Sequence, residues 1–178
     1  PSLRPFEYDP PDLNMEVVRL IKVLPRDDHG LIQVKMRHSD KLTHYRCLSY
    51  MWGQDPAVHH ILLNGRVFSA RRNLLEFLTF AGQRYANQPL WIDAMCIDQR
   101  NLAERSQQVR QMATIYGNAQ EVLVWLGKSV RLDGIIEWVQ QSHTVEENSR
   151  LDKICSNPYW TRAWIAQEIL LQANVTIV

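Results

Sequence analysis

A single carboxylate near the end of the chain, Glu168, follows aromatic and aliphatic residues in the stretch WIAQE. If this stretch is helical, Trp164 and Glu168 are one turn apart and share a face of the helix. An indole beside a carboxylate removes part of its hydration, which raises the carboxyl pKa and suits the group to handle a proton or stabilise a cation. The alternative is a solvated glutamate on the edge of a helix, or one that Arg105 or Arg162 pairs with and keeps ionised.

Further polar and aromatic residues lie toward the carboxyl ends of the predicted strands of a sheet. Those on the first two central strands are Ser49, Tyr50, Trp52, Gly53, Asp93 and Asp98. Ligands of open α/β sheets bind beyond the carboxyl ends of the strands, so these residues are candidates for one crevice. Rings to stack on and carboxylates to face hydroxyls or a developing cation suit a ligand that joins a sugar to a base. Two simpler roles stay open: the aromatic residues could close the edge of the sheet, and the aspartates could cap helices or turns.

Several common catalytic and binding patterns are absent from the sequence. There is no GxGxxG, P-loop or GxSxG motif, so neither a phosphate-binding glycine loop nor a hydrolase nucleophile elbow is expected. His59 and His60 would point to opposite faces of a strand, and we expect no metal site. The cysteines, Cys47, Cys96 and Cys155, are few and far apart without a CxxC pair, which predicts buried thiols in a reducing compartment.

The composition is that of one globular domain. The chain has 178 residues, of which 46% are hydrophobic and 22% charged. With 20 basic and 19 acidic side chains, its formal net charge of +1 gives no reason to expect nucleic acid or an anionic membrane as a partner. No run approaches the roughly 20 apolar residues of a membrane span and no signal peptide opens the chain, so we expect a cytoplasmic location. Because the chain begins with Pro1, we expect it to be part of a longer protein.

The hydrophobic pattern predicts an α/β fold, with a mostly parallel sheet flanked by helices and β-hairpins added on its N-terminal side. Alternating residues in 17–37 predict one hairpin, and Asn64-Gly65 between two apolar runs predicts a second. The central and final strands are predicted at 43–53, 89–98, 121–127 and 174–178. Residues 1–16 are expected to form an extended, proline-rich lead-in, and residues 17–178 the single domain.

Capping signals mark the predicted helices. Ser69 is a possible N-cap for a helix over 71–86, and Asn101 with Glu104 three residues later predicts a capping box for a helix that ends at Gly117. Apolar residues at helical spacing are Leu74, Leu75, Leu78 and Ala81 in the first helix and Val109, Met112, Ala113 and Tyr116 in the second. Two more helices are predicted at 133–141 and from about Pro158 onward.

Three blocks of sequence together resemble the fungal heterokaryon-incompatibility (HET) domain. They are YRCLSYMWG (45–53), LWIDAMCIDQRNLAERSQQVRQMATIYGNAQEVLVWLG (90–127) and NPYWTRAWIAQEI (157–169), in the order that the family has them. The resemblance extends over residues 17–178. It implies a module of a larger fungal protein that triggers programmed cell death when incompatible strains fuse, as a part of fungal innate immunity. The partners that it implies are other signalling domains, in the same protein or in its partners.

A more distant resemblance is to TIR domains. LSYMWG is similar to their first-strand motif, and WIAQEI is similar to their stretch Trp-Cys-x-x-Glu-Leu. Many TIR domains cleave NAD at the nicotinamide–ribose bond with that glutamate. Carried over, the resemblance implies a TIR/flavodoxin-like sheet, self-association into an oligomer, and NAD or NADP as substrate with no cofactor or metal. It implies Glu168 as the catalytic carboxylate and a nucleotide pocket lined by Ser49, Tyr50, Trp52, Gly53, Asp93, Asp98 and Trp164.

Two hypotheses of different classes therefore remain. The first is an NAD(P) glycohydrolase. The second is a non-enzymatic signalling module that oligomerises and recruits partners through the same aromatic surface, with Glu168 as a rim charge. They differ in one structural expectation, because only the enzyme requires the candidate residues to converge on one concave pocket. The residues that test this are Tyr50, Trp52, Asp93 and Glu168.

Overall fold

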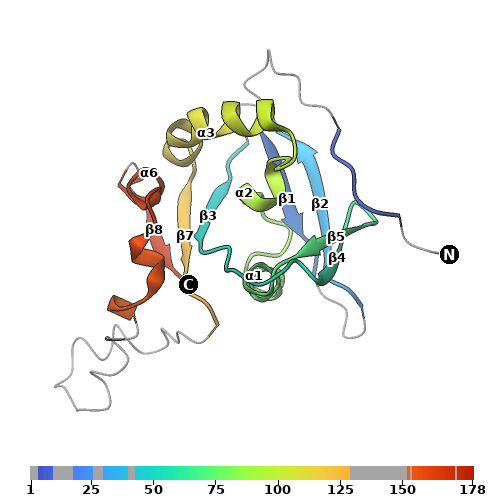
Figure 1. Ribbon diagram of the computed structural model, residues 1–178, viewed down its shortest axis with the longest axis horizontal. Helices are drawn as coiled ribbons and strands as arrows, with labels where there is room; N and C mark the ends of the chain where they lie inside the picture. Colours follow the sequence, from blue (N-terminus) through green and yellow to red (C-terminus); the bar gives the residue numbers. More distant parts are fainter. Residues whose placement is uncertain are drawn as a thin grey trace.

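The computed structural model describes residues 4–9, 18–25, 30–39, 43–128, 152, 154–170 and 172–178. Eight strands form one sheet at its centre (Figure 1). The strands are β1 (Arg19–Val23), β2 (Gln33–His38), β3 (Arg46–Tyr50), β4 (His59–Leu63), β5 (Arg66–Ala70), β6 (Leu90–Trp91), β7 (Glu121–Trp125) and β8 (Val175–Ile177). The helices are α1 (Arg72–Arg84), α2 (Asp93–Cys96), α3 (Leu102–Gly117), α6 (Ile165–Ile169) and the 3₁₀-helix η1 (Pro158–Thr161). The helix predicted at 133–141 lies outside the described residues.

The sheet confirms the predicted α/β class. It is mixed, with four parallel strand pairings, and its three antiparallel pairings lie in the two hairpins and where β1 meets β6. The strand order is β5-β4-β2-β1-β6-β3-β7-β8. Strands β6, β3, β7 and β8 pair in parallel and form the half that α/β folds use for ligands. The predicted hairpins, β1–β2 and β4–β5, are both present and join that half through an antiparallel contact between β1 and β6. Asn64 and Gly65 turn the second hairpin with positive φ angles of 50° and 76°.

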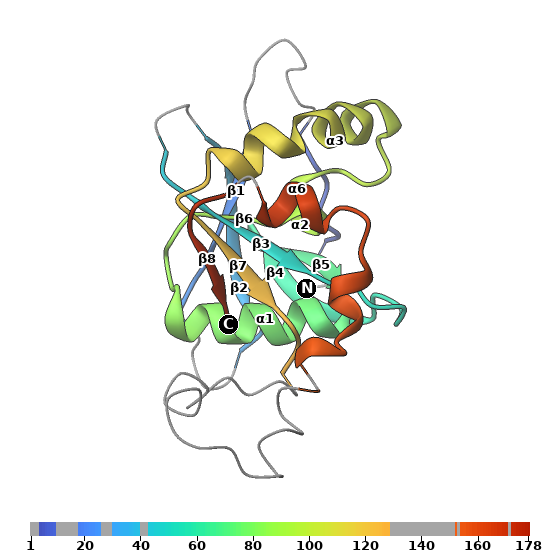
Figure 2. The ribbon, with the colours of Figure 1, turned by 90° about the vertical axis from the view of Figure 1, so that its left-hand side faces the viewer.

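Helices cover both faces of the sheet. Figure 2 shows α1 on one face and α2, α3 and α6 on the other. In α1, Leu74, Leu78 and Ala81 are buried as their spacing predicted, whereas Leu75 is only half-buried and Phe77 is buried in addition. The prediction that Ser69 caps this helix is wrong, because Ser69 still pairs with His60 inside the β4–β5 hairpin and the helix begins at Arg72.

Helix α3 begins where the sequence predicted, directly after Asn101. The side chain of Asn101 caps the helix by accepting a hydrogen bond from the backbone N–H of Glu104, at 3.2 Å. Met112 and Tyr116 are buried as expected, whereas Ala113 is exposed. The carboxylate of Glu104 pairs with Arg19 on the first strand, so it does not reach back to complete a capping box.

Two predicted elements are shorter than expected, and both differences place residues near the candidate site. The strand predicted at 89–98 ends at Trp91, and Asp93 begins the single turn α2 by accepting a hydrogen bond from the N–H of Ala94 at 2.7 Å. The helix predicted from Pro158 onward is broken between η1 and α6. Arg162 follows η1 directly, and its side chain donates to Glu168 in α6, further along the chain.

The described part of the predicted lead-in, residues 4–9, lies along the sheet. The backbone N–H of Phe6 donates to the carbonyl of Val67 at 2.8 Å, and the N–H of Val67 donates to Arg4 at 2.9 Å. The Tyr8 hydroxyl then donates to the carbonyl of Met95 in α2, at 2.9 Å. The lead-in therefore extends the β5 edge and contacts the turn that carries Asp93.

Candidate functional site

Glu168 is the most deeply buried carboxylate at the C-terminal end of the fold, with 1% of its side chain exposed. Both oxygens face one guanidinium: Arg162 Nη2 donates to Oε1 at 2.7 Å and Arg162 Nη1 donates to Oε2 at 2.8 Å. The hydroxyl of Ser49, in β3, also donates to Oε2 and is hydrogen-bonded to the hydroxyl of Tyr159. Residues from β3, η1 and α6 thus hold this carboxylate in a fixed position.

Arg162 carries the positive charge of this network. Partial burial acts to lower the pKa of the Arg162 guanidinium, but the hydrogen bonds and the charge of Glu168 outweigh it and raise that pKa. Burial raises the pKa of the Tyr159 hydroxyl to about 12, so this group stays neutral. Within the described residues, Oε1 of Glu168 accepts only from Arg162, which leaves one of its lone pairs available to a ligand.

A cavity of about 380 Å³ opens beside this network, and Glu168 and Arg162 form part of its wall. The cavity lies beyond the carboxyl ends of β3 and β6, where Trp52 and Asp93 follow the two strands. Its apolar lining comes from Met51, Ile97, Val109 and Met112. Trp164 contributes the second indole and is 48% exposed.

Asp93 provides the second carboxylate of the cavity. Trp52 Nε1 donates to its two oxygens at 2.9 and 3.1 Å, and Gln99 Nε2 donates to its backbone carbonyl at 3.0 Å. Burial raises the pKa of Asp93 from its ordinary value of 3.8 to about 6, although hydrogen bonds from Ala94 and Trp52 act against the rise. The charge of Glu168 adds to the rise. Asp93 therefore exchanges a proton near neutral pH, which is useful in a catalytic acid or base.

Replacing Asp93 by asparagine should remove a pH dependence of stability. Because the pKa of Asp93 is higher in the folded protein, its protonated form contributes stability that is fully present below about pH 4 and is lost as the pH rises through about 6. Relative to Asp93→Asn, the free energy of unfolding of the unchanged chain should fall over this interval by up to about 3 kcal/mol, at about 1.4 kcal/mol per pKa unit. Urea denaturation at a series of pH values measures this difference, with the exposed Asp55→Asn as control. A difference that stays constant with pH would contradict the assignment.

The structure brings only some of the candidate residues together. Ser49 is buried and is not among the described residues that line the cavity, but its hydroxyl donates to Glu168, which does line it. Tyr50 is 2% exposed and lies on a separate cavity of about 140 Å³. Gly53 lies on a third cavity, of about 610 Å³, and adopts a φ of +76°. Of the four residues named as the test, Trp52, Asp93 and Glu168 therefore converge and Tyr50 does not.

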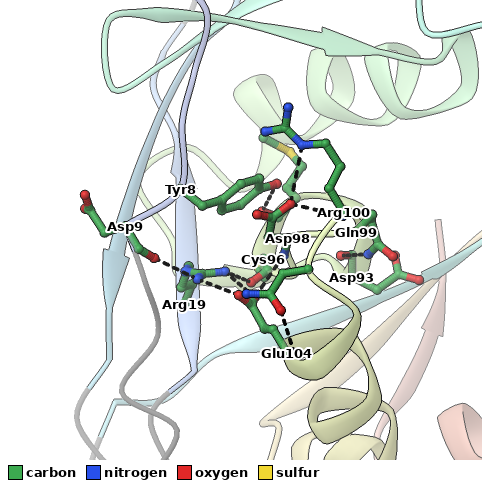
Figure 3. A network of polar contacts seen from close by, with 11 residues as sticks. Tyr8, Asp9, Arg19, Asp93, Cys96, Asp98, Gln99, Arg100 and Glu104 are labelled. Atoms are coloured by element: carbon green, nitrogen blue, oxygen red, sulfur yellow. Dashed lines mark hydrogen bonds and ion pairs between the residues drawn. The ribbon is translucent and has the colours of Figure 1, made fainter.

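Asp98 belongs to a second network of polar contacts, which Figure 3 shows together with Asp93 and Gln99. Arg19 and Glu104 form its centre, with exposed fractions of 5% and 2% and a shortest N–O distance of 2.5 Å. Arg19 Nη1 donates to the carbonyl of Cys96 at 3.0 Å, and the N–H of Asp98 donates to Glu104 at 2.9 Å. The Asp98 carboxylate accepts from the N–H of Arg100 at 3.1 Å. This network fixes the chain between α2 and α3, and Asp98 is not among the described residues that line the cavity.

Two side chains that contact residues of the candidate site were not selected as site residues from the sequence. Tyr159 lies in the same aromatic block as Glu168, but nothing in the spacing shows that its hydroxyl would meet Ser49. Gln99 follows the predicted strand, and its contact with Asp93 depends on the turn of α2. Arg162 was one of two alternative partners for Glu168, and the structure selects it.

Fold and cavity together define an α/β domain with a small acidic and aromatic cavity at the carboxyl ends of its parallel strands. The sequence model of the Heterokaryon incompatibility protein (HET) family matches residues 45–168, and the chain belongs to this family. It is also similar to Heterokaryon incompatibility protein 6, OR allele, of Neurospora crassa, with 35% identity over 128 residues. That match covers 58% of this chain and 19% of the relative, so the chain spans about a fifth of the relative's length. No solved structure matches the chain.

Two further observations concern possible partners. Across the part of the chain that the structure describes, none of the helices combines the length and the apolar character that a membrane crossing requires. Among the same residues, no three His, Cys, Asp or Glu side chains gather closely enough to hold a metal ion.

Proposed function

We propose that this chain is the cell-death-inducing domain of a fungal heterokaryon-incompatibility protein and that it acts as an NAD(P) glycohydrolase. Its family and its similarity to the Neurospora crassa protein support the first part. One observation carries the second part: the buried carboxylate of Glu168 lines a cavity together with Asp93 and the indoles of Trp52 and Trp164. Buried charge at a concave, aromatic site is a common feature of catalytic sites.

The proposed reaction breaks the bond between nicotinamide and the ribose C1′. The bonding electrons leave with nicotinamide, which becomes neutral, and the positive charge moves to an oxocarbenium ion at C1′. The carboxylate of Glu168 stabilises this charge, because a fixed anion in a site with little water interacts strongly with a developing cation. Water then adds to C1′ and loses a proton, which gives ADP-ribose. Asp93, whose pKa is about 6, is mostly ionised at neutral pH and accepts this proton.

The remaining residues of the network position these two groups. Arg162, Ser49 and Tyr159 hold the Glu168 carboxylate in one orientation. Trp164 offers an exposed indole on which a base can stack, and stacking of a base on an aromatic side chain is worth about 1–3 kcal/mol. Self-association that covers Trp164 would exclude water from the cavity and raise activity.

The second hypothesis, a non-enzymatic signalling module, is favoured by a different observation. The charge of Glu168 is already balanced within the protein by Arg162, as in a purely structural ion pair. Large hydrophobic side chains stand exposed around it, with Trp160 at 38%, Trp164 at 48% and Leu170 at 80%. Such residues suit an association surface.

Product analysis separates the two hypotheses. The purified chain, in free solution and clustered on a vesicle surface, is incubated with NAD or NADP, and nicotinamide and the ADP-ribose product are quantified by chromatography. The glycohydrolase predicts equal amounts of the two products and faster release on clustering. Absence of both products under clustering would favour the signalling module.

A further inference from the structure

The cavity beside Glu168 has a second guanidinium on its wall, that of Arg105 in α3. The two arginines of the cavity differ in their partners. Arg162 gives both terminal nitrogens to Glu168. Arg105 is exposed, and among the described residues its guanidinium has no hydrogen bond or ion pair. Within the described residues, the guanidinium of Arg105 therefore keeps its whole hydrogen-bonding capacity for a ligand, whereas that of Arg162 is used by Glu168.

Arg105 and Glu168 place opposite charges at the two ends of the cavity, which gives it a direction from a negative end to a positive end. Glu168 is 1% exposed and lies at the deep end, whereas Arg105 is exposed and lies at the mouth. The backbone of Arg105 is well fixed, because Arg19 holds its neighbour Glu104 (Figure 3). In addition, the side chain of Asn101 caps the helix. The N-terminal end of α3 adds its own partial positive charge near this position.

A ligand that matches this direction carries positive charge at one end and negative charge at the other. The deep carboxylate, with Asp93 nearby, suits a sugar that bears a cationic base or becomes an oxocarbenium ion. A planar guanidinium matches phosphate oxygens with two parallel hydrogen bonds, which makes arginine well suited to phosphate recognition. We infer that Arg105 binds a phosphate group of the substrate, so that the cavity selects phosphorylated pyridinium ribosides such as dinucleotides over the free nucleoside. This inference rests on the glycohydrolase activity proposed above and names its substrate class.

The test compares Arg105→Gln with Arg110→Gln, a control that removes the same charge from an exposed position of the same helix away from the cavity. Binding of ADP-ribose is measured by calorimetry, and cleavage is measured with NAD and with nicotinamide riboside, which has no phosphate. Thermal unfolding of each variant verifies that the fold is retained. We expect Arg105→Gln to weaken ADP-ribose binding and to raise the KM for NAD about tenfold, with kcat little changed. Cleavage of nicotinamide riboside should not change, and Arg110→Gln should behave as the unchanged chain.

The outcomes distinguish this inference from the proposed activity. If no substrate is cleaved but the unchanged chain binds ADP-ribose about tenfold more tightly than Arg105→Gln, the proposed glycohydrolase activity is wrong, whereas the contact between Arg105 and a phosphate is supported. If NAD is cleaved and both variants bind ADP-ribose equally well, the activity stands and the phosphate contact is overturned. The phosphate contact is also overturned if the unchanged chain does not bind ADP-ribose. The same holds if Arg105→Gln lowers the cleavage of nicotinamide riboside as much as it lowers the cleavage of NAD.

Discussion

Replacing Glu168 by glutamine is expected to reduce nicotinamide release from NAD by at least about a hundredfold, the usual loss when one group that stabilises transition-state charge is removed. Glutamine has nearly the same shape, and its one acceptor oxygen can take the place of Oε2, which accepts from both Arg162 Nη1 and Ser49. Its NH2 group cannot accept from Arg162 Nη2 as Oε1 does, and it carries no negative charge beside C1′. The loss should therefore appear in kcat, with smaller effects on KM.

The control for this substitution is Glu121→Gln. Glu121 also pairs with an arginine, Arg46, at 2.7 Å, but it is 21% exposed and lies outside the cavity. Its replacement should leave nicotinamide release within about twofold, since surface ion pairs contribute little to a fold. Thermal unfolding of both variants shows whether the domain stays folded. A folded Glu168→Gln variant with undiminished release would keep the enzyme and remove Glu168 from its mechanism.

Replacing Arg162 by methionine is expected to lower the free energy of unfolding by about 3–5 kcal/mol, the usual cost of leaving one partner of a buried ion pair unpaired. The guanidinium donates to both oxygens of a carboxylate that is 1% exposed, so among the described residues its loss leaves that charge with the Ser49 hydroxyl alone. Urea denaturation measures the change.

Two further variants decide whether the buried charge is the cause. Arg162→Met combined with Glu168→Met removes both charges and should recover more than half of the lost stability, because apolar replacement of a whole buried pair is often neutral. Arg46→Met breaks a pair whose side chains are 22% and 21% exposed and should cost about 1 kcal/mol or less. An equal loss from Arg162→Met and Arg46→Met would show that burial of the Glu168 pair has no special effect.

The parts of the fold that depend on neighbouring residues could be predicted from the sequence. Asn64 and Gly65 mark a hairpin because two successive positive φ angles need these residue types. Asn101 marks the start of α3 because its side chain is suited to accept a free N–H of the first turn. The period of the apolar residues placed α1 and the central strands.

Contacts between distant segments could not be predicted, and they decide the site. Glu104 has the spacing of a capping box, yet its carboxylate pairs with Arg19 from the other end of the chain. Asp93 and Asp98 looked equivalent as residues following a strand. The turn of α2 separates them, so that Asp93 faces the cavity and Asp98 joins the network in Figure 3.

The partner of Glu168 could not be predicted from the sequence either, because it too depends on how the chain folds between two elements. Both Arg105 and Arg162 were available, and only the break between η1 and α6 brings Arg162 within 2.7 Å. The apolar period around Pro158 predicted one continuous helix, because periodicity does not reveal where the Asn157 side chain starts a separate short turn.

We propose above that Glu168, Asp93 and the indoles of Trp52 and Trp164 form the binding site of a pyridine dinucleotide. A crystal structure of the Glu168→Gln variant grown with NAD tests it most directly, since slow turnover leaves the substrate intact. We predict that the nicotinamide riboside lies between Trp52 and Trp164, with C1′ beside residue 168 and a phosphate at Arg105. An empty cavity at saturating NAD, or NAD bound only elsewhere on the domain, would contradict it.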